Sequence, residues 1–122
     1  MLSVRFFQHT FVFVLLSDIA VAADFLPLSH GIFVESSVAC TSASNATALS
    51  YWGDELNSSK VIGTIVKVKM TGESYRVALD LNIQGESGGK EDWTIVIKDP
   101  RHMTVTSAYG TSSYRWCYHR MP

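Results

Sequence analysis

The sequence predicts an all-β, mainly antiparallel domain: a seven-stranded meander that forms a curled sheet or a small barrel and carries one disulfide. Apolar and polar residues alternate with a period of two over residues 75–83, a pattern that a helix could not bury on one face. Short apolar segments recur between turn-forming residues along the rest of the chain, as in up-and-down β proteins. The third observation is a single pair of cysteines, Cys40 and Cys117.

The first 22 residues have the features of a signal peptide. Arg5 gives a weakly basic start, residues 11–16 form a compact apolar run, and Ala20-Val21-Ala22 has the small-x-small pattern of a cleavage site. Asp18 lies close behind the apolar run. The run is therefore far shorter than the ~20 apolar residues that a membrane-spanning helix needs. We therefore expect cleavage after Ala22 (or one residue later), a single β domain over residues 23–122, and no stable membrane insertion afterwards.

The two cysteines fit this export. Exported chains meet oxidising conditions, in which a lone pair of thiols tends to be oxidised to a disulfide. Cys40 and Cys117 are separated by most of the mature chain. Two buried free thiols are the alternative. We expect the disulfide and a periplasmic or secreted location.

Composition limits the partners. The formal net charge is −1 at pH 7, and removal of Arg5 and Asp18 with the signal segment leaves it unchanged. Nucleic acids and anionic lipids select for basic proteins. We therefore expect no nucleic-acid partner.

The strands are expected between clusters of Gly, Pro, Asn, Asp and Ser. A lead-in containing Pro27 precedes the first one, and a Ser/Ala/Thr/Asn-rich loop surrounds Cys40. The seven predicted strands are residues 31–34, 49–52, 61–70, 75–84, 93–98, 103–107 and 114–118.

The central hairpin is the clearest prediction. In its first strand, one face is expected to carry Ile62, Val66, Val68 and Met70. Lys67 and Lys69 are expected on the other face. A turn at residues 71–74 leads into the second strand.

A polar, glycine-rich loop is predicted at residues 85–92. It contains Ser87, Gly88, Gly89 and Lys90 and is long for a hairpin connection. Loops on a rigid sheet often carry binding residues. We take these four residues as the candidate partner-binding site, with a plain strand connection as the alternative.

Signatures of catalysis or metal binding do not stand out. The pattern G-x-S-x-G occurs at residues 85–89, but between two predicted strands and not between a strand and a helix, so no serine lies in a nucleophile elbow. The carboxylates Glu86, Glu91 and Asp92 fall in the predicted loop. The mature histidines, His30, His102 and His119, are scattered singly. We predict no catalytic residues, no metal site and no cofactor, and a protein that is not an enzyme.

Two triplets match the N-glycosylation acceptor pattern: Asn45-Ala46-Thr47 and Asn57-Ser58-Ser59. Both are expected in loops. Their use would require a eukaryotic secretory route.

Much of the mature chain resembles a group of small exported proteobacterial proteins of unassigned function. The resemblance rests on Leu26-Pro27-Leu28, His30-Gly31-Ile32-Phe33-Val34, Cys40, Ala43-Ser44-Asn45-Ala46-Thr47, Gly72-Glu73-Ser74-Tyr75-Arg76-Val77 and the segment 114–117. Members of that group often carry further cysteines around the central hairpin, and this chain has none there.

The segment Ser87-Gly88 with Lys90 is similar to a loop of small periplasmic lysozyme inhibitors, which are β domains with few disulfides. In some of them a Ser-Gly loop enters the lysozyme cleft and a lysine engages the catalytic carboxylates. The longer motif and the usual cysteine placement of that family are not matched here. The resemblance implies that Ser87, Gly88, Gly89 and Lys90 would contact such an enzyme through charge-assisted hydrogen bonds.

The function predicted from the sequence is therefore an envelope or secreted binding protein that occludes a protein partner. That partner is a lysozyme, another muramidase or an effector toxin. The alternative is a carrier that holds a small ligand inside a barrel, although Tyr75, Leu79, Ile83 and Trp93 are expected to point inward and fill it.

Overall fold

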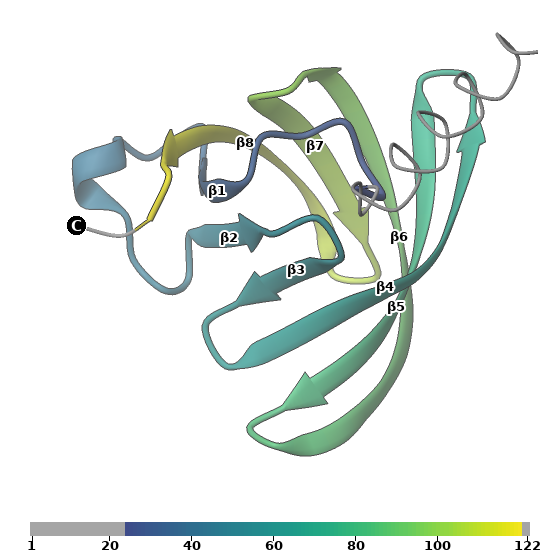
Figure 1. Cartoon of the computed structure of the whole chain (residues 1–122). Coiled ribbons are helices and arrows are strands. Elements are labelled where there is room, and N and C mark those ends of the chain that lie inside the picture. Colours follow the sequence, from purple (N-terminus) through teal and green to yellow (C-terminus); the bar gives the residue numbers. More distant parts are fainter. Residues whose placement is uncertain (1–23, 121–122) are drawn as a thin grey trace, which may run out of the picture.

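The computed structural model describes residues 24–120, and these residues form a closed antiparallel β-barrel (Figure 1). Each strand pairs with its neighbours in sequence, and the last strand pairs with the first. The predicted signal segment lies outside the described residues. The strands are β1 (Gly31–Glu35), β2 (Ala48–Tyr51), β3 (Glu55–Ser58), β4 (Val61–Thr71), β5 (Ser74–Ile83), β6 (Glu86–Asp99), β7 (His102–Ser107) and β8 (Gly110–Tyr118), with a 3-10 turn η1 (Cys40–Ser42) between β1 and β2.

The prediction of an all-β, antiparallel domain with one disulfide is confirmed, and the barrel alternative holds over the curled sheet. The predicted number of strands is wrong by one, because the prediction has no strand between residues 52 and 61, where β3 lies. Its Leu56 is buried, but Asn57 and Ser58 are polar. The Asn57 side chain bonds to Glu55 and to the backbone N–H of Gly63, so Asn57 lies in a strand and not in the predicted loop.

The two ends of the barrel are built differently. One end carries the lead-in of residues 24–30 together with the β2–β3, β4–β5 and β6–β7 turns; we call it the plugged end. The opposite end, called the open end, carries the β1–β2 connection and the β3–β4, β5–β6 and β7–β8 turns. The long strands β4, β5 and β6 run beyond the shorter ones at both ends (Figure 1).

A bulge in β4 changes which residues face inward. The register between β4 and β5 shifts at Val66, between the pairs Ile65↔Leu79 and Lys67↔Ala78. Before the bulge the inward residue is Ile65, and Ile62 is exposed; after it, Val68 lies on the inner face. The prediction that Ile62 and Val66 share a face with Val68 was therefore wrong, because an extra residue reverses the alternation.

The barrel interior is filled by side chains. The lead-in contributes Leu26 and Leu28, which close the plugged end from inside the barrel. Of the four residues predicted to fill the barrel, Leu79 is fully buried, Tyr75 and Trp93 pack against the core, and Ile83 is exposed. The core cluster consists of Leu26, Leu28, Phe33, Leu49, Tyr51, Leu56, Ile65, Val77, Leu79, Ile95, Met103 and Val105.

Closure of the barrel depends on close backbone contact at the start of β1. Gly31 has a φ of 142°, and a Cβ at this position would overlap with the Trp116 indole nitrogen and the Tyr118 carbonyl oxygen. Because glycine leaves this space free, the Trp116 indole N–H donates to the His30 carbonyl at 3.0 Å. β1 and β8 then pair in register from Phe33 opposite Trp116 onward.

The β1–β2 connection is fastened to the outside of β8. Cys40 forms the predicted disulfide with Cys117. The Arg115 guanidinium donates to the carbonyls of Glu35 and Val38, and the Tyr118 hydroxyl donates to the Cys40 carbonyl. These bonds hold a segment that has little buried apolar surface of its own.

Replacement of both Cys40 and Cys117 by serine should lower the free energy of unfolding. The bridged residues are 77 positions apart, and for such a loop the chain-entropy model gives about 4.5 kcal/mol. Urea unfolding of the oxidised protein and of the double variant measures the difference. Wild-type protein reduced with dithiothreitol should match the variant; an unchanged stability in both would contradict the prediction.

Gly31→Ala should destabilise the barrel far more than Gly110→Ala. Both glycines have a similar positive φ (142° and 136°), but nothing surrounds the position of a Cβ at Gly110. The Gly110 variant therefore isolates backbone strain, on the order of 1–3 kcal/mol, and the Gly31 variant adds the collision with β8. Equal losses of melting temperature in the two variants would show that the β1–β8 contact is not limiting.

Candidate functional site

The segment predicted as a binding loop is part of a strand. Ser87, Gly88, Gly89 and Lys90 belong to β6, and the loop prediction for residues 85–92 is wrong. Gly89 pairs with Leu81 and Ser87 with Asn82, which leaves Gly88 as the extra residue of a bulge. A run of glycines in a sequence is typical of a loop. Here the glycines allow the bulge and let the Ile83 side chain lie close to Gly88.

The connection between β5 and β6 is only two residues long. Ile83 pairs with Glu86, and the residues between them, Gln84 and Gly85, have φ values of 53° and 92°. Positive φ at both positions is the geometry of a type I′ turn, whose twist matches that of the flanking strands. The Asn82 side chain accepts a hydrogen bond from the Gly85 N–H at 2.8 Å and supports the turn.

Residues 80–92 therefore form a paired, projecting hairpin end at the open end of the barrel, which we call the lip (Figure 1). Lys90 forms an ion pair with Asp80 across the two strands, with 3.1 Å between Nζ and Oδ1. Ile83 is 42% exposed. The lip holds four carboxylates (Asp80, Glu86, Glu91 and Asp92) and one ammonium group, so its net charge is −3.

Beside the lip, the open end contains a pocket of about 210 Å³. Leu49 and Val105 form its buried part, and the rings of Trp93 and Tyr114 line it. The Trp93 indole N–H donates to Glu91 Oε1 at 2.9 Å, which orients the ring. Burial raises the pKa of Tyr114, and the Glu35 carboxylate acts in the same direction. The pocket is lined by Asn45, Ala46, Ala48, Leu49, Ser58, Trp93, Val105, Ser107, Gly110, Ser112 and Tyr114.

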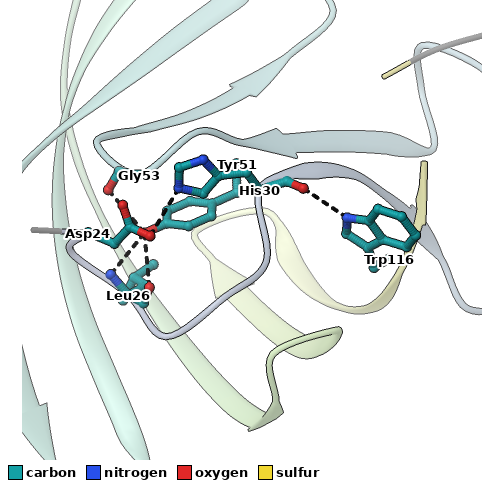
Figure 2. Close-up of polar contacts among 6 residues, drawn as sticks. All are labelled: Asp24, Leu26, His30, Tyr51, Gly53 and Trp116. Carbon is teal, nitrogen blue, oxygen red and sulfur yellow. Dashed lines mark hydrogen bonds and ion pairs between the residues drawn. The ribbon is translucent and has the colours of Figure 1, made fainter. Parts of the chain in front are cut away.

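At the plugged end, one buried hydroxyl holds the lead-in in place (Figure 2). The Tyr51 Oη accepts a hydrogen bond from the Leu26 N–H, and its proton faces the carbonyls of Leu26 and Gly53, all at 3.0 Å. Above it, His30 Nε2 lies 3.0 Å from Asp24 Oδ2, and the His30 ring contacts the Tyr51 ring edge-on. Burial raises the pKa of Tyr51 to about 12, and the carboxylates of Asp24 and Asp54 act in the same direction.

His30 and His102 lie in separate ion pairs. His30 pairs with Asp24, whereas His102 pairs with Asp99 at the β6–β7 turn, 2.9 Å between Nδ1 and Oδ1. The hydrogen bond from His102, followed by that from the Arg101 N–H, lowers the pKa of Asp99. Over residues 24–120, no group of three or more His, Cys, Asp or Glu side chains is arranged to hold a metal ion.

Three features of the two ends were missed from the sequence. Pro27 in the lead-in suggested an irregular segment, which is correct, but Leu26 and Leu28 on either side of it are core residues. The Tyr51 network joins residues far apart in the chain, so no local pattern signals it. The acidic lip can be recognised from the composition of residues 80–92, but the net charge of the whole chain, which is −1, does not reveal it.

The fold and its ends define a small, disulfide-bonded, closed eight-stranded antiparallel barrel with one plugged and one open end. Comparisons with protein-family models, curated proteins and solved structures find no significant match. In the part of the chain that the structure describes, no helix is long and apolar enough to cross a membrane.

Tyr51→Phe should lower the free energy of unfolding at pH 7 by about 1–3 kcal/mol, because the buried Leu26 N–H loses its acceptor. Tyr109→Phe is the control, since Tyr109 is 89% exposed. Urea unfolding measures both, and equal stability of the two variants would contradict the role of the Tyr51 hydroxyl.

The same residue predicts an alkaline transition. A phenol whose pKa is raised in the folded state stabilises the fold fully below its unfolded value near 10 and loses that contribution as the pH rises to about 12. Wild-type stability should fall between pH 10 and pH 12, and the fall should be smaller in Tyr51→Phe. Identical pH profiles of the two proteins would exclude this coupling.

Proposed function

We propose that this chain is an exported protein-binding module that occludes a protein partner through the lip at its open end. The observation that carries the proposal is the filled barrel interior: recognition has to take place on the outside or at the ends. The open end presents a projecting, paired hairpin with an exposed isoleucine and a net charge of −3.

The lip has the physical features of a docking element. A two-residue turn and a ladder of backbone pairs on both sides of the Gly88 bulge keep it ordered, so little conformational entropy is lost on binding. Ile83 offers apolar area, and its side chain lies against the bulge at Gly88. The carboxylates around them select a basic surface and increase the rate of encounter with it.

The proposed contact residues include Ser87, Gly88, Gly89 and Lys90. The carboxylates beside them, and not Lys90, are proposed to make the main charged contacts with the partner. The Asp80 carboxylate already pairs with Lys90, and it competes with any carboxylate that a partner would offer to this lysine. The geometry therefore favours recognition of a basic partner by Glu86, Glu91 and Asp92 over insertion of Lys90 into an acidic cleft. Peptidoglycan hydrolases of the lysozyme and muramidase type, and effector toxins, are the partners we propose.

A carrier function has less support. The open-end pocket of about 210 Å³ is smaller than the roughly 300–1,000 Å³ of typical small-molecule sites. Its two aromatic rings and hydroxyl groups suit, at most, one small polar ring. A titration of the mature protein with small ligands, followed by Trp fluorescence, tests this second candidate.

The proposed function is tested with the mature protein (residues 23–122) against a panel of purified muramidases of different isoelectric point. We expect inhibition and a measurable dissociation constant with at least one basic member. The double variant Glu86→Lys/Asp92→Lys should weaken binding by roughly tenfold or more, because it reverses the charge of the lip. Lys69→Glu, a charge reversal at the plugged end, should change binding less than threefold.

Lys90→Ala separates the two modes of binding. If the acidic residues of the lip make the contact, this variant binds as well as the wild type or better. If it abolishes inhibition while Glu86→Lys/Asp92→Lys has no effect, Lys90 enters the partner's cleft and the proposed contact is wrong. Absence of binding to the whole panel at micromolar concentration would exclude muramidases as partners.

A further inference from the structure

Strand β4 has an edge that the barrel does not use. β3 covers β4 only from Val61 to Thr64, and the last backbone bond on that side joins the Ile65 N–H to the Asp54 carbonyl at 2.8 Å. Beyond it, residues 67–71 pair with β5 on one side, with Val66 as the bulged residue before them, and no strand among residues 24–120 covers the other side of residues 66–71. Figure 1 shows the β4–β5 hairpin running past β3 toward the plugged end. We call residues 66–71 the free edge.

Free strand edges pair readily with other extended chains, and proteins usually block them. This edge carries two such blocks, the bulge at Val66 and two lysines. Because lysines repel one another, they discourage pairing of the edge with the same edge of a second copy. They do not discourage a strand of opposite charge.

Like charges lie close together on the β4–β5 hairpin, which lowers its stability. Lys69 lies directly opposite Arg76 in the β4–β5 register, and Lys67 lies two residues from Lys69 on the same face. Opposed like charges weaken a strand pair. Within residues 24–120 the ion pairs are Asp24–His30, Lys90–Asp80 and Asp99–His102, so Lys67, Lys69 and Arg76 have no carboxylate partner in this part of the chain.

The inner face of the same hairpin is apolar and only partly covered. Met70 is 63% exposed and lies opposite Tyr75. Tyr75 lines two hollows, one of about 440 Å³ with Met70 and Ile97 and one of about 560 Å³ with Phe25 and Pro100. A strand placed beside the free edge would thus have cations on one face and apolar surface on the other.

We propose that the free edge of β4 binds an extended segment of a partner protein as an added strand, in which acidic and apolar residues alternate. Backbone bonds to residues 66–71 supply affinity. Lys67, Lys69 and Arg76 select the acidic side chains on the outer face, and Met70 and Tyr75 accept the apolar ones on the inner face. This site lies at the opposite end of the barrel from the lip and does not rest on the function proposed for the lip.

A synthetic peptide of about six residues, with alternating Glu and Val and blocked termini, tests the proposal on the mature protein. Backbone NMR should show shifts and slower amide exchange confined to the free edge and its β5 partners. The same peptide with Lys in place of Glu, and a Glu/Val peptide with alternate backbone nitrogens methylated, should each bind at least tenfold more weakly. Equal binding of all three, or shifts centred on the lip, would overturn the proposal.

The variant Lys67→Glu/Lys69→Glu should reverse the preference, so that the Lys/Val peptide binds better than the Glu/Val peptide. Lys60→Glu, a reversal in the β3–β4 turn at the open end, should leave the preference unchanged. All three lysines are exposed, and unchanged melting temperatures would verify that the variants fold. An unaltered preference in the double variant, or concentration-dependent pairing of two copies through this edge, would also overturn the proposal.

Discussion

The pairing of β1 with β8 is the constraint on which the rest of this structure depends. It converts a meander into a closed barrel and encloses the core from every side. The pairing requires a residue without a side chain at Gly31, because the Trp116 ring and the end of β8 occupy the space next to it. The disulfide between Cys40 and Cys117 and the hydrogen bonds of Arg115 then fasten the adjoining connection to the same strand.

Closure also determines where binding can take place. The interior of a small closed barrel is occupied by side chains of its own strands. At the plugged end the lead-in adds Leu26 and Leu28 to this core. The surface that remains for partners is carried by β4, β5 and β6, which are longer than their neighbours. Their two projecting ends have opposite charge: the lip is acidic, whereas the β4–β5 hairpin carries Lys67, Lys69 and Arg76. The near-zero net charge of the chain does not reveal these two local charges of opposite sign.

Sequence patterns predicted the parts of the fold that depend on local periodicity. The β4–β5 hairpin followed from strict alternation in β5, and the disulfide from the presence of only two cysteines together with the expectation of export. β3 was missed because only Leu56 in it is clearly apolar. Residues 85–92 were misread because glycines that form a bulge look like glycines that form a loop. The prediction of which β4 residues face inward was wrong before Val66, because one inserted residue in a strand exchanges the inward and outward positions that follow it. The Tyr51 network and the free edge depend on strands meeting in space, which a single sequence does not encode locally.

The up-and-down order of the strands has a consequence for how the molecule is made. Each strand from β2 to β8 can pair with the strand made just before it, but one edge of β1 has no partner until β8, which is synthesised last. A sheet without β8 would have unpaired edges at β1 and β7, and unpaired strand edges pair readily with other extended chains. The disulfide between Cys40 and Cys117 also needs β8, so closure of the barrel and oxidation of these two cysteines both have to wait for the last part of the chain.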